Sequence, residues 1–391
     1  MAQFKRKSTA KAKEAEQQLV TRVLRVRLKD KHAALLRAQA AQVNLVWNFC
    51  NETGLKVLRR EGKFVNASDL HLLTVGATKA GLDLHSQTVQ AVNEEYVTRR
   101  QQFQKAKLNW RVSNPDSARY SLGWVPFKKS AIAYRNGQVH FRGVALSLWD
   151  SYGLAGYQLG AGCFSEDARG RWYLNVTIKV KKKPLAQTPT RAIGIDLGLK
   201  DFMAGSNGLK VKAERFYRGI EPKLAVAQRA GKKGRVKALH AKAANRRKDA
   251  LHKLSTTLVR THQLIAVGDV SPSALAQTKM AKSVYDAGWS AFRTMLSYKC
   301  DDAGSWFFNV NEAYSTQECH HCGETTGPKG LQGLSQRSWT CSACGAEHER
   351  DLNSALVIRS RGLTELEKQF TDAAAALEKE VSNKAPRHHL A

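Results

Sequence analysis

The stretch RAIGIDLGLKDFMAGSNG, residues 191–208, contains an apolar run that ends in Asp196, a turn at Gly198 and then a second strand-like run. Short apolar runs bounded by turn residues are typical of buried strands. THQLIAVGDVSPSAL (261–275) contains another such run, which ends in Gly-Asp, and SWFFNV (305–310) is a third. The pattern predicts buried strands with small or acidic residues at their ends.

Three carboxylates occupy distinctive positions near these runs. Asp196 ends the first strand, Glu312 lies just past SWFFNV, and Asp351 lies at the start of RDLNSALVI, a predicted helix. Each has an ordinary structural explanation, since Asp196 suits a turn and Asp351 suits a helix N-cap. Together they suit a metal centre, because hydrolysis of a phosphodiester by two Mg²⁺ ions needs several carboxylates that converge from different elements. The residues of the predicted helix expected to pack inward are Leu352, Ala355, Leu356 and Ile358.

The chain is strongly basic. Its 63 Lys and Arg against 33 Asp and Glu give a formal net charge of +30 and a pI of about 10.0. Such a surplus repels itself unless a polyanion neutralises it, and nucleic acid is the natural partner because phosphate contacts release counterions. A ribosome-like or chromatin-like basic protein is the ordinary alternative. We find no long apolar span, signal peptide or lipidation motif, so a membrane partner is not expected.

One segment concentrates this charge. Residues 223–253 contain 11 Lys or Arg and a single acid, Asp249. A solvated helix face is the ordinary interpretation of a charge run, but the imbalance favours a helical pair that binds the nucleic-acid backbone. The first predicted strand also carries a basic face. The candidate nucleic-acid-binding residues are Lys232, Lys233, Arg235, Lys237, Arg246, Arg247, Arg25 and Arg27.

Four of the seven cysteines form two Cys-x2-Cys pairs separated by 18 residues, which is the spacing of a two-knuckle zinc site. A glycine follows each pair and lets backbone amides turn toward the sulfurs. Four thiolates complete a closed tetrahedral shell, so the nearby His320, His321 and His348 are expected on the surface. The predicted Zn²⁺ ligands are Cys319, Cys322, Cys341 and Cys344.

The other three cysteines, Cys50, Cys163 and Cys300, are scattered and are interpreted as buried thiols. One metal cluster with isolated thiols fits a reducing, cytoplasmic environment better than a disulfide framework does.

The N-terminal half predicts a β-rich module with a helical insertion. Residues 1–18 form a basic arm, and VTRVLRVRL has strand periodicity. Helical spacing follows, with Ser86 as a plausible N-cap of the second helical stretch. Strand signals then return and include Asn136-Gly137, the strongest short hairpin signal. Residues 19–40 and 107–185 are therefore predicted to form a β-barrel-like module interrupted by a helical insertion at 41–106.

The segments IGIDLGLKDF (193–202), the two Cys-x2-Cys pairs and ERDLNSALVI (349–358) resemble the RuvC-type nuclease of the TnpB family. These proteins are RNA-guided DNA endonucleases of bacterial insertion sequences, related to Fanzor proteins and compact type V CRISPR effectors. SLGWVPFKK (121–129) is similar to the wedge-domain segment of that family.

The resemblance implies an α+β multidomain fold, in which a β-barrel wedge module with a helical recognition insertion precedes an RNase H-like (RuvC) α/β nuclease domain. The nuclease domain would span 190–314 and 346–391, with a zinc ribbon inserted at 315–345. Two catalytic Mg²⁺ ions, one structural Zn²⁺, a guide RNA and a target double-stranded DNA are implied, with no small-molecule substrate and a bacterial, nucleoid-associated setting.

The family places an Asp on the first strand, a Glu after a later strand and an Asp after the ribbon. Asp196 and Asp351 match the first and third positions, but Gly268-Asp269 stands where most members have Glu-Asp. One branch carries a substitute carboxylate just before the ribbon, and Glu312 stands there. Asp269 is the competing assignment, and a nuclease-dead protein is a third possibility.

The function that the resemblance implies is cleavage of DNA next to a short flanking motif, guided by base pairing to RNA. The alternative is a nuclease-inactive, RNA-guided DNA-binding transcriptional repressor with the same fold. A cut-and-paste transposase has weaker support, because no separate domain that binds transposon ends is evident.

Overall fold

The computed structural model describes residues 19–271, 277, 280–330, 333 and 335–384. The predicted basic arm at 1–18 lies outside the described residues. The described residues divide into two compact units, the first ending at Lys181 and the second beginning at Lys182. Short 3-10 helices also occur: η1 (Asp30–His32), η2 (Lys129–Ala131), η3 (Leu154–Gly156) and η4 (Arg218–Ile220).

The first unit is built on a seven-stranded sheet in the order β2-β6-β7-β1-β5-β4-β3. All the pairings between its strands are antiparallel. Asn136 and Gly137 both have positive φ, 51° and 73°, which confirms the predicted hairpin turn between β3 and β4. The strands are β1 (Leu19–Leu28), β2 (Trp124–Phe127), β3 (Ile132–Arg135), β4 (Gln138–Phe141), β5 (Val144–Trp149), β6 (Leu159–Glu166) and β7 (Trp172–Lys181).

Three helices fall between β1 and β2: α2 (Ala33–Glu61), α3 (Ala67–Leu73) and α4 (Ser86–Phe103). Residue 41, the expected start of the helical insertion, lies inside α2, which begins at Ala33. Ser86 is the first helical residue, and the N-cap is His85, whose ring accepts a hydrogen bond from the Gln87 amide.

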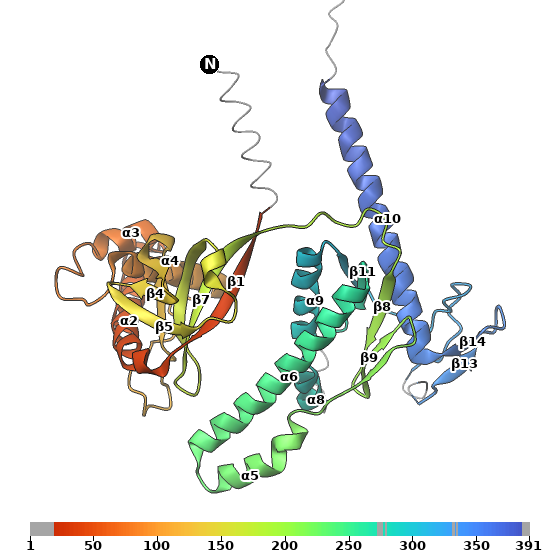
Figure 1. Cartoon of the computed structure of the whole chain (residues 1–391), viewed down its shortest axis with the longest axis horizontal. Helices are drawn as coiled ribbons and strands as arrows, with labels where there is room; N and C mark the ends of the chain where they lie inside the picture. The colour runs from red at the N-terminus through yellow and green to blue at the C-terminus, as the bar shows by residue number, and fades with distance from the viewer. Residues whose placement is uncertain (1–18, 272–276, 278–279, 331–332, 334, 385–391) are drawn as a thin grey trace, which may run out of the picture. The chain divides into compact units, whose positions relative to one another are not determined.

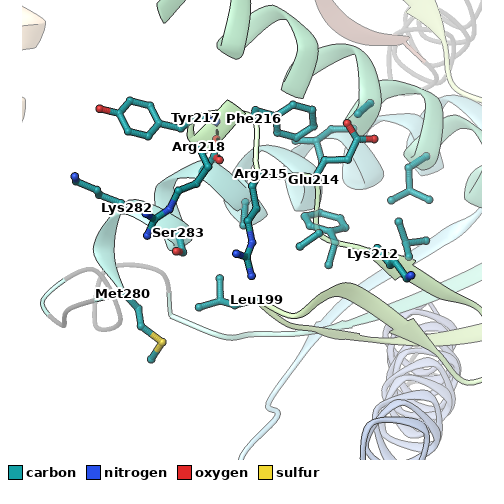
Figure 2. A pocket seen from close by; sticks show the side chains of 18 of the residues that line it. Leu199, Lys212, Glu214, Arg215, Phe216, Tyr217, Arg218, Met280, Lys282 and Ser283 are labelled. Carbon is teal, nitrogen blue, oxygen red and sulfur yellow. Dashed lines mark hydrogen bonds between the residues drawn. The ribbon is translucent and has the colours of Figure 1, made fainter. Parts of the chain in front are cut away.

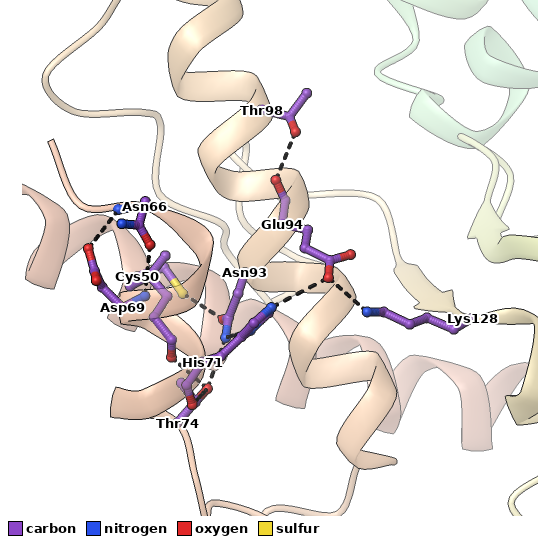
Figure 3. A network of polar contacts seen from close by, with 10 residues as sticks. Cys50, Asn66, Asp69, His71, Thr74, Asn93, Glu94, Thr98 and Lys128 are labelled. Atoms are coloured by element: carbon purple, nitrogen blue, oxygen red, sulfur yellow. Dashed lines mark hydrogen bonds and ion pairs between the residues drawn. The ribbon is translucent and has the colours of Figure 1, made fainter.

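A polar network fixes these helices to one another (Figure 3). The Asn93 side chain is fully buried, donates to Thr74 Oγ1 at 2.9 Å and accepts from the Cys50 thiol at 3.2 Å. Glu94 on the same helix pairs with Lys128 Nζ at 2.7 Å. Burial raises the pKa of Cys50 to about 12, which agrees with the prediction of an unreactive buried thiol.

The second unit is built on a five-stranded sheet in the order β10-β9-β8-β11-β12. Strand β11 pairs in parallel with both β8 and β12, whereas β8, β9 and β10 are antiparallel. The C-terminal ends of β8, β11 and β12 therefore meet at one edge of the sheet. The strands are β8 (Ala192–Leu197), β9 (Asp201–Gly205), β10 (Lys210–Lys212), β11 (Leu264–Gly268) and β12 (Trp306–Val310).

Helices cover both faces of this sheet (Figure 1). Ile193, Ile195 and Leu197 of β8 pack with residues of α6 and α9. The alternate residues Gly194 and Asp196 therefore face α10. A Cβ at Gly194 would lie 2.1 Å from the carbonyl oxygen of Ala355, so this glycine lets α10 rest directly on β8. The helices are α5 (Glu221–Arg229), α6 (Lys233–Thr261), α8 (Ala281–Ala287), α9 (Trp289–Ala303) and α10 (Arg350–Lys384).

The cysteine-rich segment between β12 and α10 contains a short antiparallel pair, β13 (Ser338–Thr340) and β14 (Glu347–Glu349). The β14 strand leads directly into α10, so this small element is joined to the helix that covers the sheet. Within the described part of the chain, no helix combines the length and the hydropathy that crossing a bilayer requires.

Candidate functional site

Asp196 stands near the end of β8, on the face of the sheet that α10 covers. Its side chain is largely buried, and burial raises the pKa of its carboxyl to about 7, together with the negative charges of Glu312 and Asp351. A hydrogen bond with Ser354 on α10 opposes this rise. The charges of Glu312 and Asp351 thus lie close enough to Asp196 to influence its carboxyl.

The Glu312 side chain packs against Gly268, the last residue of β11. A Cβ placed on Gly268 would lie 2.5 Å from Glu312 Oε2 and 3.1 Å from Glu312 Cβ. The carboxylate of Glu312 therefore fills the space that a side chain at position 268 would occupy. Burial raises the pKa of Glu312, as does the nearby charge of Asp269.

Asp269 has a different place. Its side chain is exposed, and its Oδ1 accepts a hydrogen bond of 3.1 Å from the backbone amide of Glu312. Arg361 on α10 holds the same loop from the other side, because its Nη1 donates to the carbonyl oxygens of Asn311 at 2.6 Å and Ala313 at 3.0 Å. Both side chains position the backbone that carries Glu312.

Asp351 lies in the first turn of α10. Arg337, just before β13, places its Nη1 3.2 Å from each carboxylate oxygen of Asp351. The Arg337 carbonyl also accepts a 2.8 Å hydrogen bond from the Arg350 amide. Helix α10 begins at Arg350, so Asp351 is inside the helix rather than at its N-cap, and its carboxylate is paired with a cation.

Sequence reasoning missed the polar residues of α10 that connect this site to the cysteine-rich segment. Asn353 Nδ2 donates to the carbonyl oxygen of Glu318 at 2.7 Å, and Asn353 Oδ1 accepts from the His320 amide at 3.1 Å. The Ser354 and Ser315 hydroxyls lie 2.7 Å apart. The available signal was a polar Asn-Ser pair within an apolar helical run.

The inward face of α10 differs accordingly from the prediction. Ala355 and Ile358 are fully buried, as predicted, but Leu352 and Leu356 are only partly buried. Asn353, Ser354 and Val357 take the buried positions instead. Asn353 and Ser354 are tolerated there because both have hydrogen-bond partners.

Asp196→Asn is expected to stabilise the protein in Mg²⁺-free buffer at about pH 8. The folded state holds the proton of Asp196 more tightly than the unfolded state does, so stability falls as the pH rises from the ordinary pKa of 3.8 to the folded value of about 7. Asparagine carries no charge and therefore removes this loss in the free energy of unfolding. The loss is on the order of 2 kcal/mol, because partial contact with water screens the charge repulsion. Denaturant titrations of both proteins should show a smaller gain near pH 5, and a gain that does not depend on pH would contradict the expectation.

The four predicted zinc ligands form a compact cluster. The Sγ atoms of Cys319, Cys322, Cys341 and Cys344 all lie within 4.8 Å of one another. The Cys319–Cys344 and Cys322–Cys341 sulfur distances are both 3.7 Å. A tetrahedral ion with Zn–S bonds of about 2.3 Å separates its sulfurs by roughly 3.8 Å. The Thr326 hydroxyl lies 3.2 Å from Cys341 Sγ and lowers the pKa of that thiol to about 6.

His348 is not on the surface, contrary to the prediction. Only 5% of the residue is exposed, its Nε2 lies 3.0 Å from Cys319 Sγ, and its ring centroid lies 4.4 Å from that of Trp339. Burial lowers the pKa of His348, which favours the neutral ring. A neutral ring protonated at Nε2 donates to the sulfur. His320 and His321 are exposed, as predicted.

The predicted nucleic-acid-binding residues divide into two groups. Arg247 is partly buried and pairs with Asp286 at 3.2 Å, so it contributes to packing, whereas Arg27 forms an exposed ion pair with Asp30 at 3.0 Å. The Arg25 guanidinium lies 4.1 Å from the ring centroid of Tyr173. The residues exposed on or beside α6 are Lys232, Lys233, Arg235, Lys237 and Arg246. Helices α5 and α6 confirm the predicted helical pair.

A cavity of about 470 Å³ lies elsewhere in the second unit, with Arg215 and Lys282 among its charged lining residues (Figure 2). Phe202 and Leu251, which also line it, belong to the core that α6 and α9 cover. Asp196 faces α10 on the opposite side of the sheet, so this cavity is separate from the site that contains Asp196, Glu312 and Asp351.

Comparison with known proteins confirms the resemblance to TnpB and Cas12f proteins. Residues 175–279 match the family model OrfB_IS605, described as "Probable transposase". Residues 289–358 match the model described as "Cas12f1-like, TNB domain". The first match covers the β8–β11 region, and the second runs from α9 through the cysteine cluster to Ile358, so it includes both Glu312 and Asp351.

Two relatives extend the similarity. A Streptomyces pristinaespiralis protein named "Putative RNA-guided DNA endonuclease" is 33% identical over 264 residues, which cover 63% of this chain and 64% of that protein. An Escherichia coli protein named "Putative RNA-guided DNA endonuclease InsQ" is 26% identical over 221 residues, which cover 49% of this chain and 54% of that protein. The matched regions thus span less than two thirds of the length of either relative.

The fold is also similar to a chain of a solved structure, described as the cryo-EM structure of the Cas12f1-sgRNA-target DNA complex. The TM-score is 0.58 at 11% sequence identity, and the match covers 88% of this chain and 99% of that chain. This confirms the predicted mixed α+β architecture as a Cas12f-like fold.

Proposed function

We propose that this chain is an RNA-guided DNA endonuclease whose second unit hydrolyses DNA with two divalent metal ions. The observation that carries the proposal is the position of Glu312, whose carboxylate fills the side-chain space of Gly268 and whose charge acts on Asp196. Strand β11 ends in Gly268, which has no carboxylate, and Glu312 from the loop after the neighbouring strand β12 places a carboxylate there. The two relatives named as RNA-guided DNA endonucleases support the same activity.

The sheet of the second unit supports an RNase H-like, RuvC-type nuclease. Three neighbouring parallel strands, β8, β11 and β12, end at one edge, where Asp196 and the loop after β12 deliver their carboxylates. Helix α10 would bring Asp351 to the same metal site. The cysteine-rich element lies between the second and third acids in the sequence, so it is proposed as the inserted ribbon.

The donor set fits Mg²⁺, which prefers carboxylate oxygens. Burial raises the pKa of both Asp196 and Glu312, and neighbouring acids add to the rise, namely Glu312 and Asp351 for Asp196 and Asp269 for Glu312. Two bound Mg²⁺ ions would supply an activated water and stabilise the leaving oxygen, giving 5′-phosphate and 3′-hydroxyl products. Asp196, Glu312 and Asp351 would hold them, and Asp351 would have to exchange its contact with Arg337 for this role.

The sulfur cluster fits a structural Zn²⁺, because four thiolates leave no open coordination position. His348 would donate to the Cys319 sulfur and reduce its charge. The ion would therefore hold the ribbon in shape and take no part in the cleavage reaction.

The partners proposed are a guide RNA and a target double-stranded DNA. The exposed basic residues of α5 and α6 would contact phosphates, while base pairing with the guide would select the sequence. The first unit is proposed as the wedge module, with a helical recognition insertion that begins at Ala33 rather than at residue 41.

The protein purified together with its own transcript should cut a matching DNA target only when Mg²⁺ is present. A non-matching target should remain intact under the same conditions, since pairing with the guide selects the site. DNA that is bound but not cut in Mg²⁺ would overturn the nuclease and favour a guided DNA-binding repressor.

A further inference from the structure

A cleft in the first unit is lined by aromatic and basic side chains that the proposed cleavage reaction does not use. Its volume is about 650 Å³, and its lining comes from α2, α4, β2 and the segment between α4 and β2. Trp47 and Leu108 are its most buried lining residues. Phe103 and Trp110 also line it, although 55% and 45% of these residues are exposed. Two large rings are thus left accessible at one cleft.

The segment that carries Trp110 is held in place by asparagine side chains of α2. Asn51 exchanges two hydrogen bonds with the backbone of Leu108, at 2.7 and 2.9 Å. Asn48 exchanges two with the backbone of Arg111, both at 2.9 Å. Trp110 lies between these two anchored residues. Its exposed ring is therefore presented by a fixed backbone, so little ordering entropy is lost when a ligand binds.

The charge of the cleft favours an anionic ligand. Its lining contains the cations Arg99, Lys105 and Arg111 and one acid, Glu95, which pairs with Arg99 at 2.6 Å. Lys107 adds a further cation 5.4 Å from the Trp110 ring centroid. The Arg111 guanidinium lies 5.7 Å from the ring centroid of Trp124 and donates to the carbonyl oxygen of Leu122 at 2.7 Å. Accessible rings flanked by cations are the combination that binds single-stranded nucleic acid, because rings stack on bases and cations follow phosphates.

We propose that this cleft binds an unstacked nucleobase of a single-stranded stretch of nucleic acid. Trp110 and Phe103 contact the faces of the base, and Lys105 and Lys107 contact the flanking phosphates. The inference rests on the proposed function only in taking nucleic acid as the partner. A duplex does not supply this ligand, because its bases are stacked and paired inside the helix.

The experiment uses the whole chain and short single-stranded RNA and DNA oligonucleotides that contain 2-aminopurine, whose fluorescence is quenched by stacking. Trp110→Ala is expected to weaken binding about 5-fold to 100-fold and to remove the quenching, whereas Trp110→Phe keeps most of both. Trp149→Ala is the matched control, because Trp149 is 62% exposed in the same unit and does not line the cleft. The oligonucleotide whose affinity falls more in Trp110→Ala, RNA or DNA, identifies which kind of strand the cleft binds.

The inference is overturned if Trp110→Ala binds as tightly as Trp149→Ala, or if its loss of affinity is the same for a duplex as for the single strand. Other outcomes distinguish this inference from the proposed nuclease activity. If the Trp110→Ala protein still performs guided cleavage and binds the single-stranded oligonucleotide unchanged, only the base-binding role of the cleft is contradicted. If oligonucleotide binding depends on Trp110 but the protein shows no Mg²⁺-dependent cleavage, only the proposed nuclease activity is contradicted.

Discussion

Glu312→Ala is expected to reduce Mg²⁺-dependent cleavage of a guided DNA target by roughly 10³-fold, because a metal site that loses one of three carboxylates loses several kcal/mol of transition-state stabilisation. Binding of the target should persist, since the exposed basic residues that would hold phosphates are unchanged. Cleavage is followed on gels with guide-loaded protein. Glu367→Ala, which removes an exposed carboxylate from α10, is the matched control and should cut like the wild type.

The contact between Glu312 and Gly268 allows a sharper version of this test. Gly268→Ala alone should impair cleavage, because its Cβ would lie 2.5 Å from Glu312 Oε2 and displace the carboxylate. Gly268→Glu combined with Glu312→Ala should restore a substantial part of the lost activity, since it supplies a carboxylate from β11 to the space that Glu312 vacates.

Asp269 separates the two assignments of the middle carboxylate. Asp269→Asn keeps a side-chain oxygen that can accept the Glu312 amide, so its effect on cleavage should be much smaller than that of Glu312→Ala. Full activity in Glu312→Ala together with an inactive Asp269→Asn would give the role to Asp269 and contradict the placement of Glu312 in the site.

Cys341→Ser is expected to abolish Zn²⁺ binding and to unfold the ribbon. Zinc supplies on the order of 10 kcal/mol of folding free energy in small four-ligand sites, which a segment with only short strands does not replace. Trp339, packed on His348 beside the cluster, should then become solvent-exposed. Metal analysis of the purified protein and limited proteolysis between residues 315 and 345 measure the two effects.

Loss of the ribbon should also abolish cleavage, because Asn353 and Ser354 connect it to the carboxylate group. Cys163→Ser is the control, since Cys163 lies in the first unit outside the cluster. It should keep its zinc and its resistance to protease. A Cys341→Ser protein that retains a full equivalent of zinc would show that the cluster is not the binding site.

The local features of the fold were accessible from the sequence. Short apolar runs located β8, β11 and β12, and the Asn136-Gly137 pair located the β3–β4 hairpin. The spacing of the four cysteines predicted their cluster, because each pair is a local turn and only one long-range closure is needed. These signals are local, so a single sequence carries them.

The prediction for His348 failed because its deciding partner is distant in the sequence. His348 is held inside by Cys319, 29 residues earlier, and nothing near it in the sequence indicates burial. The contact of Arg247 with Asp286, 39 residues later, is likewise not indicated by the local pattern. The expected start of the helical insertion at residue 41 stays a prediction and lies inside α2, which runs without a break from Ala33 to Glu61.

The sequence by itself determined which acids are available, how basic the chain is and that four thiols are spaced for one metal ion. Only the tertiary structure decided that Glu312 occupies the side-chain space of Gly268 and that Asp269 binds the backbone of the Glu312 loop. The physical reason is that parallel pairing sets β11 and β12 side by side, so two residues 44 positions apart in the chain share one volume beneath α10.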